Sequence, residues 1–191
     1  MNRMRSAKLT LIRAGQLIDG TGNPPLSDGA LLVRDGRIEA VGVFADLSVP
    51  SGAEEIDLRP WILLPGLIDA HVHLVGGPEP GTFWNTQRES DEWLLLRASA
   101  NARAALAAGL TTVRDCGGRG TVIISLSRAI AAGMVPGPRM VSCGAPITTT
   151  GGHCYFLGLE ADGIEGVRRA VRQMHKAGAD FIKVMVTGGG M

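Results

Sequence analysis

The sequence lacks the features that several classes of protein require. Its 19 basic and 18 acidic side chains leave a formal net charge of +1, which is too small to recruit nucleic acid or anionic lipid. No apolar run approaches the length of about 18 residues that a membrane span needs, and the N-terminus has no apolar signal region. The three cysteines are too few and too scattered for a disulfide framework. We therefore expect a cytoplasmic protein with reduced thiols and with no nucleic-acid or membrane partner.

Glycine, by contrast, is abundant. The 27 glycines among 191 residues make up about 14% of the chain, about twice the usual share. Apolar residues account for 45% of the sequence and the mean hydropathy is +0.16, so the chain can fill a hydrophobic core. These values predict a folded protein with many tight turns.

The first sixty residues have the pattern of short β-strands joined by hairpins. Ala30–Arg34 and Arg37–Val41 flank Asp35-Gly36, a dipeptide that favours a type I′ turn because both of its residues tolerate positive φ. Helical periodicity is absent from this part of the chain. We expect residues 1–60 to form part of a small β-sandwich.

After Pro60 the pattern changes to that of an α/β protein. Trp61–Ile68 is almost continuously apolar, which is typical of a strand buried on both faces. Three units follow, each with a helical stretch, a glycine stop and a strand: Glu92–Ala108 with Leu110–Arg114, Val122–Ala132 with Pro138–Ser142, and Ile164–Ala177 with Phe181–Val186. This alternation predicts a parallel sheet with right-handed crossovers over residues 61–191, joined to the first domain near residues 50–59.

Two histidines stand at the end of the first strand of this sheet. A strand repeats every two residues, so His71, His73 and Asp69 are expected on one face. Neutral imidazoles placed side by side are good ligands for a divalent transition metal. The alternative is a pair of histidines that only cap the strand through hydrogen bonds, but a buried apolar run that ends in two imidazoles favours the metal.

Lys183 is an isolated charge in the apolar segment Phe181–Val186. Burial favours the neutral amine, which is a nucleophile. Three interpretations follow: a Schiff base with a carbonyl substrate, a carbamate formed with carbon dioxide that bridges two metals, or a side chain that snorkels out of the strand end. The paired histidines on the same sheet favour the carbamate.

Other polar residues follow the second and third strands. His153, in Thr150-Gly151-Gly152-His153, could polarise a carbonyl or orient a water molecule. Asp115 is expected to anchor its loop through backbone amides. We expect His175 to be solvated. Cys116 and Cys154 have no evident base as a partner and are not expected to act as nucleophiles.

Together these motifs resemble the amidohydrolase superfamily. Residues 65–73 (PGLIDAHVH) resemble its first-strand signature, and residues 33–42 (VRDGRIEAVG) resemble its β-sandwich hairpin. Residues 109–115 (GLTTVRD), 150–153 (TGGH) and 179–183 (ADFIK) are similar to the imidazolonepropionase-like branch, which includes prolidase-type (Xaa-Pro) and Xaa-Lys/Arg dipeptidases. The resemblance covers nearly the whole chain.

The resemblance implies a (β/α)8 TIM barrel, of which residues 61–191 would form the first four strands, beside a β-sandwich that includes residues 1–60. It implies two divalent metal ions, usually Zn2+, with His71 and His73 as ligands of one ion and N6-carboxylated Lys183 bridging both. His153 takes the place of a catalytic residue that contacts the substrate. The implied reaction is attack by metal-activated hydroxide on the carbonyl of an amide, a peptide or a cyclic amide.

The family also uses two histidines from the fifth and sixth strands and an aspartate from the eighth. These strands are not in this sequence, so we expect an inactive N-terminal fragment whose open edges promote a homo-oligomer. The expected partner is a small-molecule amide or dipeptide substrate. Two alternatives remain at this point: a Schiff-base lyase or aldolase that uses Lys183, and a non-catalytic half barrel that associates with a partner.

Overall fold

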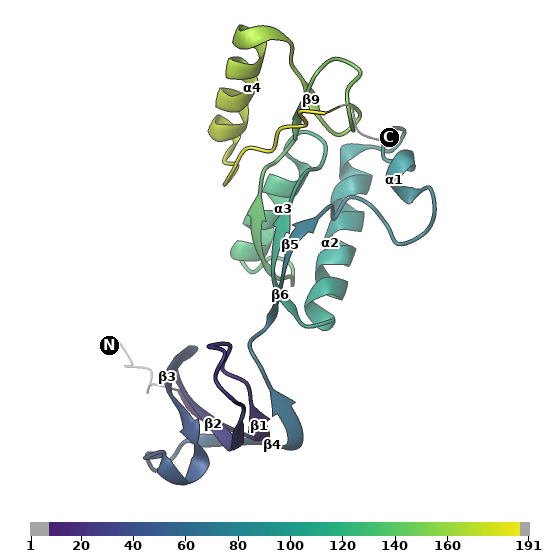
Figure 1. The fold of residues 1–191 in the computed structure, drawn as a ribbon. Helices are drawn as coiled ribbons and strands as arrows, with labels where there is room; N and C mark the ends of the chain where they lie inside the picture. The colour runs from purple at the N-terminus through teal and green to yellow at the C-terminus, as the bar shows by residue number, and fades with distance from the viewer. Residues whose placement is uncertain (1–7, 188–191) are drawn as a thin grey trace, which may run out of the picture. The chain divides into compact units, whose positions relative to one another are not determined.

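A computed structural model describes residues 8–187, which form two compact units divided between Pro65 and Gly66 (Figure 1). The first unit consists of β-strands, and the second mixes strands and helices. In this described part of the chain, no helix is both long enough and apolar enough to cross a membrane.

The first unit is a four-stranded sheet in the order β3-β2-β1-β4. Its strands are β1 (Leu9–Leu17), β2 (Leu26–Arg34), β3 (Arg37–Val43) and β4 (Glu54–Leu63), and a short 3-10 helix, η1 (Phe44–Asp46), follows β3. The hairpin between β2 and β3 turns at Asp35 and Gly36, whose φ angles of 49° and 77° confirm the predicted turn. Between residues 8 and 65 there is one sheet, not the two packed layers of a complete sandwich.

We had expected the apolar run over residues 61–68 to form one buried strand, but the structure divides it between two strands. Trp61 belongs to β4 of the first unit, and the run resumes in β5 (Leu67–Val72) of the second. Trp61 and Ile68 are 72% and 71% exposed, respectively. Pro65-Gly66 interrupts the run because proline has no N–H to donate to a sheet. We had expected the link between domains near residues 50–59, and residues 54–59 of that stretch lie within β4.

The second unit contains a three-stranded parallel sheet in the order β5-β6-β7. After β5, the elements of this unit are, in chain order, α1 (Thr82–Asn85), α2 (Asp91–Ala107), β6 (Leu110–Asp115), α3 (Val122–Ala131), β7 (Arg139–Ser142), β8 (Ile147–Thr148), β9 (Leu159–Glu160) and α4 (Gly163–Ala177). The main core lies between the sheet and helices α2 and α3, and includes Leu94, Val113, Ile123 and Leu126. The alternation of helices and strands is therefore the predicted α/β pattern.

Glycine follows each of the three long helices, as the sequence predicted. Gly109, Gly133 and Gly178 have φ angles of 91°, 70° and 98°, which are unfavourable for residues with a Cβ atom. Helix α4 buries Met174 but leaves Ile164 77% exposed, so its apolar face is shorter than the periodicity indicated.

The expected fourth strand, residues 181–186, is reduced to one bridge. Ile147 N–H donates to the Lys183 carbonyl, and Met185 N–H donates to the Ile147 carbonyl, both at 2.8 Å. These bonds place the segment in parallel beside Ile147, with Val184 as its bridge partner. Over residues 8–187 the sheet of the second unit stays open rather than closing into a barrel.

Candidate functional site

The candidate site lies at the carboxyl end of β5. His71 is the second-last residue of β5, and His73 is the first residue after the strand. The centroids of their rings are 5.3 Å apart. The end of this strand is joined to its neighbour by a hydrogen bond from Cys116 N–H to the Val72 carbonyl (2.9 Å). Consecutive odd positions of one extended strand thus bring two imidazoles side by side.

The orientation of the His73 ring is fixed by a backbone carbonyl. Nδ1 of His73 lies 2.8 Å from the carbonyl oxygen of Gly117. A carbonyl oxygen can only accept a hydrogen bond, so Nδ1 carries the proton and donates it. The lone pair of His73 is then on Nε2. Histidines that bind metals are commonly held by this kind of hydrogen bond from the other ring nitrogen.

Asp115 holds the backbone on both sides of this hydrogen bond. The side chain is fully buried, and its carboxylate accepts hydrogen bonds from the N–H groups of Leu74 and Gly117, both at 2.9 Å. Leu74 follows His73, and Gly117 supplies the carbonyl that the His73 ring contacts. Burial raises the pKa of Asp115, and the two backbone hydrogen bonds oppose this shift. The predicted anchoring role is confirmed, and it makes Asp115 a positioning residue for His73.

Lys183 belongs to the segment beside Ile147 and is half-buried. Partial burial lowers the pKa of His71, and the positive charges of Lys183 and His73 lower it further. A lowered pKa keeps the imidazole neutral near pH 7, the form that can act as a ligand. His71 is therefore under the electrostatic influence of both Lys183 and His73.

Arg114 was not singled out from the sequence. Its guanidinium carbon lies 3.9 Å from the centroid of the Phe181 ring, and its Nη1 is 3.4 Å from the Ala70 carbonyl oxygen. It thus links the segment that carries Lys183 to the strand that carries His71. The sequence of β6, LTTVRD, is mostly polar, so Arg114 did not stand out there as Lys183 does in its apolar segment.

His153 lies in the loop between β8 and β9. Its Nδ1 is buried and has no hydrogen-bond partner among residues 8–187. The loop is held by two carboxylates: Glu160 accepts from Gly151 N–H at 2.6 Å, and Asp162 accepts from Thr150 N–H at 3.1 Å. Hydrogen bonds from the Thr150 side chain and backbone lower the pKa of Asp162.

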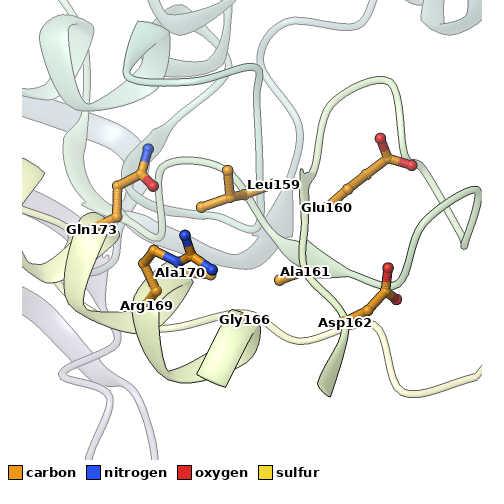
Figure 2. A pocket seen from close by; sticks show the side chains of 8 residues that line it. All are labelled: Leu159, Glu160, Ala161, Asp162, Gly166, Arg169, Ala170 and Gln173. Carbon is orange, nitrogen blue, oxygen red and sulfur yellow. The ribbon is translucent and has the colours of Figure 1, made fainter. Parts of the chain in front are cut away.

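These two carboxylates also border a hollow of about 360 Å³ between β9 and α4 (Figure 2). Glu160 and Asp162 lie on one side of it, and Arg169 and Gln173 project from α4 on the other (Figure 2). None of His71, His73, His153 or Lys183 lines this hollow. Both carboxylates already accept hydrogen bonds from the 150–151 backbone.

The described residues could supply two ligands of a metal site. Over residues 8–187, no three side chains from histidine, cysteine, aspartate and glutamate gather closely enough to hold an ion by themselves. The histidine pair fits a divalent metal nevertheless, because the hydrogen bond at Nδ1 of His73 leaves Nε2 free to ligate. The arrangement therefore suits an ion that takes further ligands from other groups.

The cysteines should be inert in the native protein. All three are buried, and burial raises the pKa of Cys143 to about 12 and also raises the pKa values of Cys116 and Cys154. We expect no thiol to react with dithionitrobenzoate within minutes at pH 8, and all three to react after unfolding in guanidinium. A fast-reacting thiol in the native protein would contradict this burial.

A parallel sheet covered by helices, with imidazoles at its carboxyl end, defines an α/β protein of the type whose active sites lie at strand ends. The chain belongs to the amidohydrolase family, whose model matches residues 62–191. This confirms the resemblance inferred from the sequence motifs. Enzymes of this family are typically metal-dependent.

Individual relatives agree with this assignment. Ochratoxinase of Aspergillus niger is 33% identical, over 97% of this chain and 43% of its own length. Its crystal structure matches with a TM-score of 0.82, over 48% of that chain. The crystal structure of a Xaa-Pro dipeptidase with bound methionine matches with a TM-score of 0.81 and 35% identity, over 95% of this chain and 48% of that one. The chain thus spans less than half the length of these relatives, and its fold matches about half of their structures.

Proposed function

We propose that the protein containing this chain is a metal-dependent hydrolase of carbon–nitrogen bonds in amides, peptides or cyclic amides. The observation that carries the proposal is the pair of imidazoles at the end of β5, with His73 fixed through Nδ1 by the Gly117 carbonyl. Membership of the amidohydrolase family supports it, as does the similarity to a Xaa-Pro dipeptidase and to ochratoxinase. The fold of this chain matches about half of its relatives' structures, which is consistent with the first four strands of a (β/α)8 barrel.

In this proposal His71 and His73 are ligands of one divalent ion, which we expect to be Zn2+. Lys183 would hold these ions as a carbamate: its deprotonated Nζ would bond to the carbon of carbon dioxide, one C=O bond would open to an oxyanion, and the nitrogen would lose a proton to solvent. The carbamate would supply anionic oxygen ligands. The positive charge of Arg114, which stacks on Phe181 near Lys183, suits a residue that becomes anionic. Asp115 keeps the His73 ring in place through the backbone.

When bound, such ions lower the pKa of water toward about 7 and polarise a carbonyl group. The contribution of the chain itself is to hold these groups at one end of the sheet. We assign His153 to contact with the substrate, since its loop carries a buried ring nitrogen without a partner within residues 8–187. We further propose that the substrate is a small amide or dipeptide and that the protein is a cytoplasmic homo-oligomer.

The test is hydrolysis by the protein as its gene encodes it. We expect release of amines from a panel of Xaa-Pro dipeptides and N-acyl amino acids. Removal of metal by a chelator should lower the rate by at least about 100-fold, and added Zn2+ should restore it. Hydrolysis that is unaffected by complete metal removal would contradict the proposal, as would the absence of hydrolysis across the panel by the Zn2+-loaded protein.

A further inference from the structure

A stack of aromatic rings begins at His73. Phe83, from α1, meets the His73 ring edge-on, with centroids 5.7 Å apart and an interplanar angle of 68°. Phe156, from the loop that carries His153, meets Phe83 in the same way at 5.7 Å and 73°. The ring centroids of Trp84 and Tyr155 lie 5.3 and 5.6 Å, respectively, from that of Phe156. The stack therefore joins the loops after β5 and β8 beside the proposed metal ligand.

A cavity of about 390 Å³ opens at the start of this stack. It is lined by His73, Gly76, Gly77 and Phe83, so its wall consists of one imidazole, one phenyl ring and glycine backbone. The cavity is widely open to solvent, so a group bound there would rest against this wall and would not be enclosed. Apart from His73, no ionisable side chain is among these lining residues from the described chain.

The backbone around the cavity is fixed by hydrogen bonds from side chains that do not line it. Asn101 of α2 donates hydrogen bonds to the carbonyls of Leu74 and Gly76, at 2.8 and 2.6 Å. Arg119 donates to the Thr86 carbonyl at 3.0 Å and pairs with Asp91 at 2.6 Å, which fixes the chain after α1. The two segments that shape the cavity are thus fixed by side chains that do not line it. Such support is typical of a preformed binding site.

We propose that this cavity binds an aromatic group of the substrate, next to the scissile carbon–nitrogen bond, with Phe83 as the residue that selects it. The selection follows from the geometry, because a ring in the cavity can stack against Phe83, which Phe156 contacts on its other side. Aromatic pairs contribute more binding free energy than the burial of their surface area alone provides. Because His73 lines the same cavity, the ring lies beside the reaction site. The inference rests on the proposed function and narrows its substrates to amides with an aromatic substituent.

Binding to metal-depleted protein tests the inference without requiring turnover. We expect calorimetry to show that N-acetylphenylalanine binds about two- to tenfold more tightly than N-acetylleucine. Phe83→Leu, which keeps an apolar side chain of similar size, should abolish this preference. Phe44→Leu is the matched control, because Phe44 belongs to the first unit and does not line the cavity. It should keep the preference.

Phe156→Leu provides a second variant in case Phe83→Leu alters folding. It leaves the lining residues in place but removes the ring behind Phe83, and it should reduce the preference without abolishing it. Equal binding of the two compounds by the unaltered protein would overturn the inference, and so would an unchanged preference in a folded Phe83→Leu variant. Failure of the Zn2+-loaded protein to hydrolyse any amide would instead count against the proposed function.

Discussion

Replacing Asp115 with alanine is expected to lower the free energy of unfolding by about 2–5 kcal/mol. The carboxylate is fully buried and accepts from two backbone N–H groups, of Leu74 and Gly117, at 2.9 Å each. Alanine leaves both donors buried without an acceptor, and each such group costs about 1–3 kcal/mol. Urea denaturation of the chain measures the change.

The same substitution should weaken metal binding, because Gly117 supplies the carbonyl that orients His73. We expect about a 10- to 100-fold loss of Zn2+ affinity in the folded variant. Asp115→Asn retains one acceptor oxygen and should give a smaller effect on both measurements. Asp46→Ala, at an exposed aspartate of the first unit, is the matched control and should change stability by less than about 0.5 kcal/mol. An Asp115→Ala protein as stable as this control would contradict the role of Asp115.

The histidines should separate into those that hold metal and those that do not. We expect His71→Ala and His73→Ala each to lower Zn2+ affinity by at least about 100-fold, since each removes a proposed ligand. His175→Ala is the matched control, because His175 is exposed on α4, and it should bind as the unaltered protein does. Competition with a chromophoric chelator measures these affinities.

His153→Ala should retain its metal but hydrolyse amides more slowly, as expected of a residue that contacts the substrate and not the ions. The loss should be about 100-fold or more in kcat, in the range of general acid–base contributions. Unchanged Zn2+ affinity in both His71→Ala and His73→Ala would show that these residues are not ligands. Loss of metal from His153→Ala would give this residue a different role.

Much of the second unit could be predicted from local patterns. Periodicity and glycine stops indicated α2, α3 and α4, because both depend on residues close together in sequence. The same holds for the pairing of His71 and His73, which is fixed by the two-residue repeat of a strand. The boundary within residues 61–68 could not be found from hydropathy, since strands in both units are apolar and only Pro65-Gly66 separates them.

The contacts that shape the site could not be predicted, because they join distant parts of the chain. His73 and Gly117 are 44 residues apart in sequence, and Leu74 and Asp115 are 41 apart. The contact of Phe83 with Phe156 depends on how two separate loops fold over the sheet. Nothing in the local pattern around Phe83 distinguishes it from an ordinary core residue.

The most direct test of the proposed metal centre is metal analysis of the protein as its gene encodes it, compared with two lysine variants. We expect about two divalent ions per chain in the unaltered protein and in Lys176→Ala, where the substituted lysine is exposed on α4. Lys183→Ala should contain neither ion at stoichiometric level, because the bridging carbamate cannot form. Stoichiometric metal in a folded Lys183→Ala protein would contradict the bridging role of Lys183 and, with it, the proposed two-ion centre.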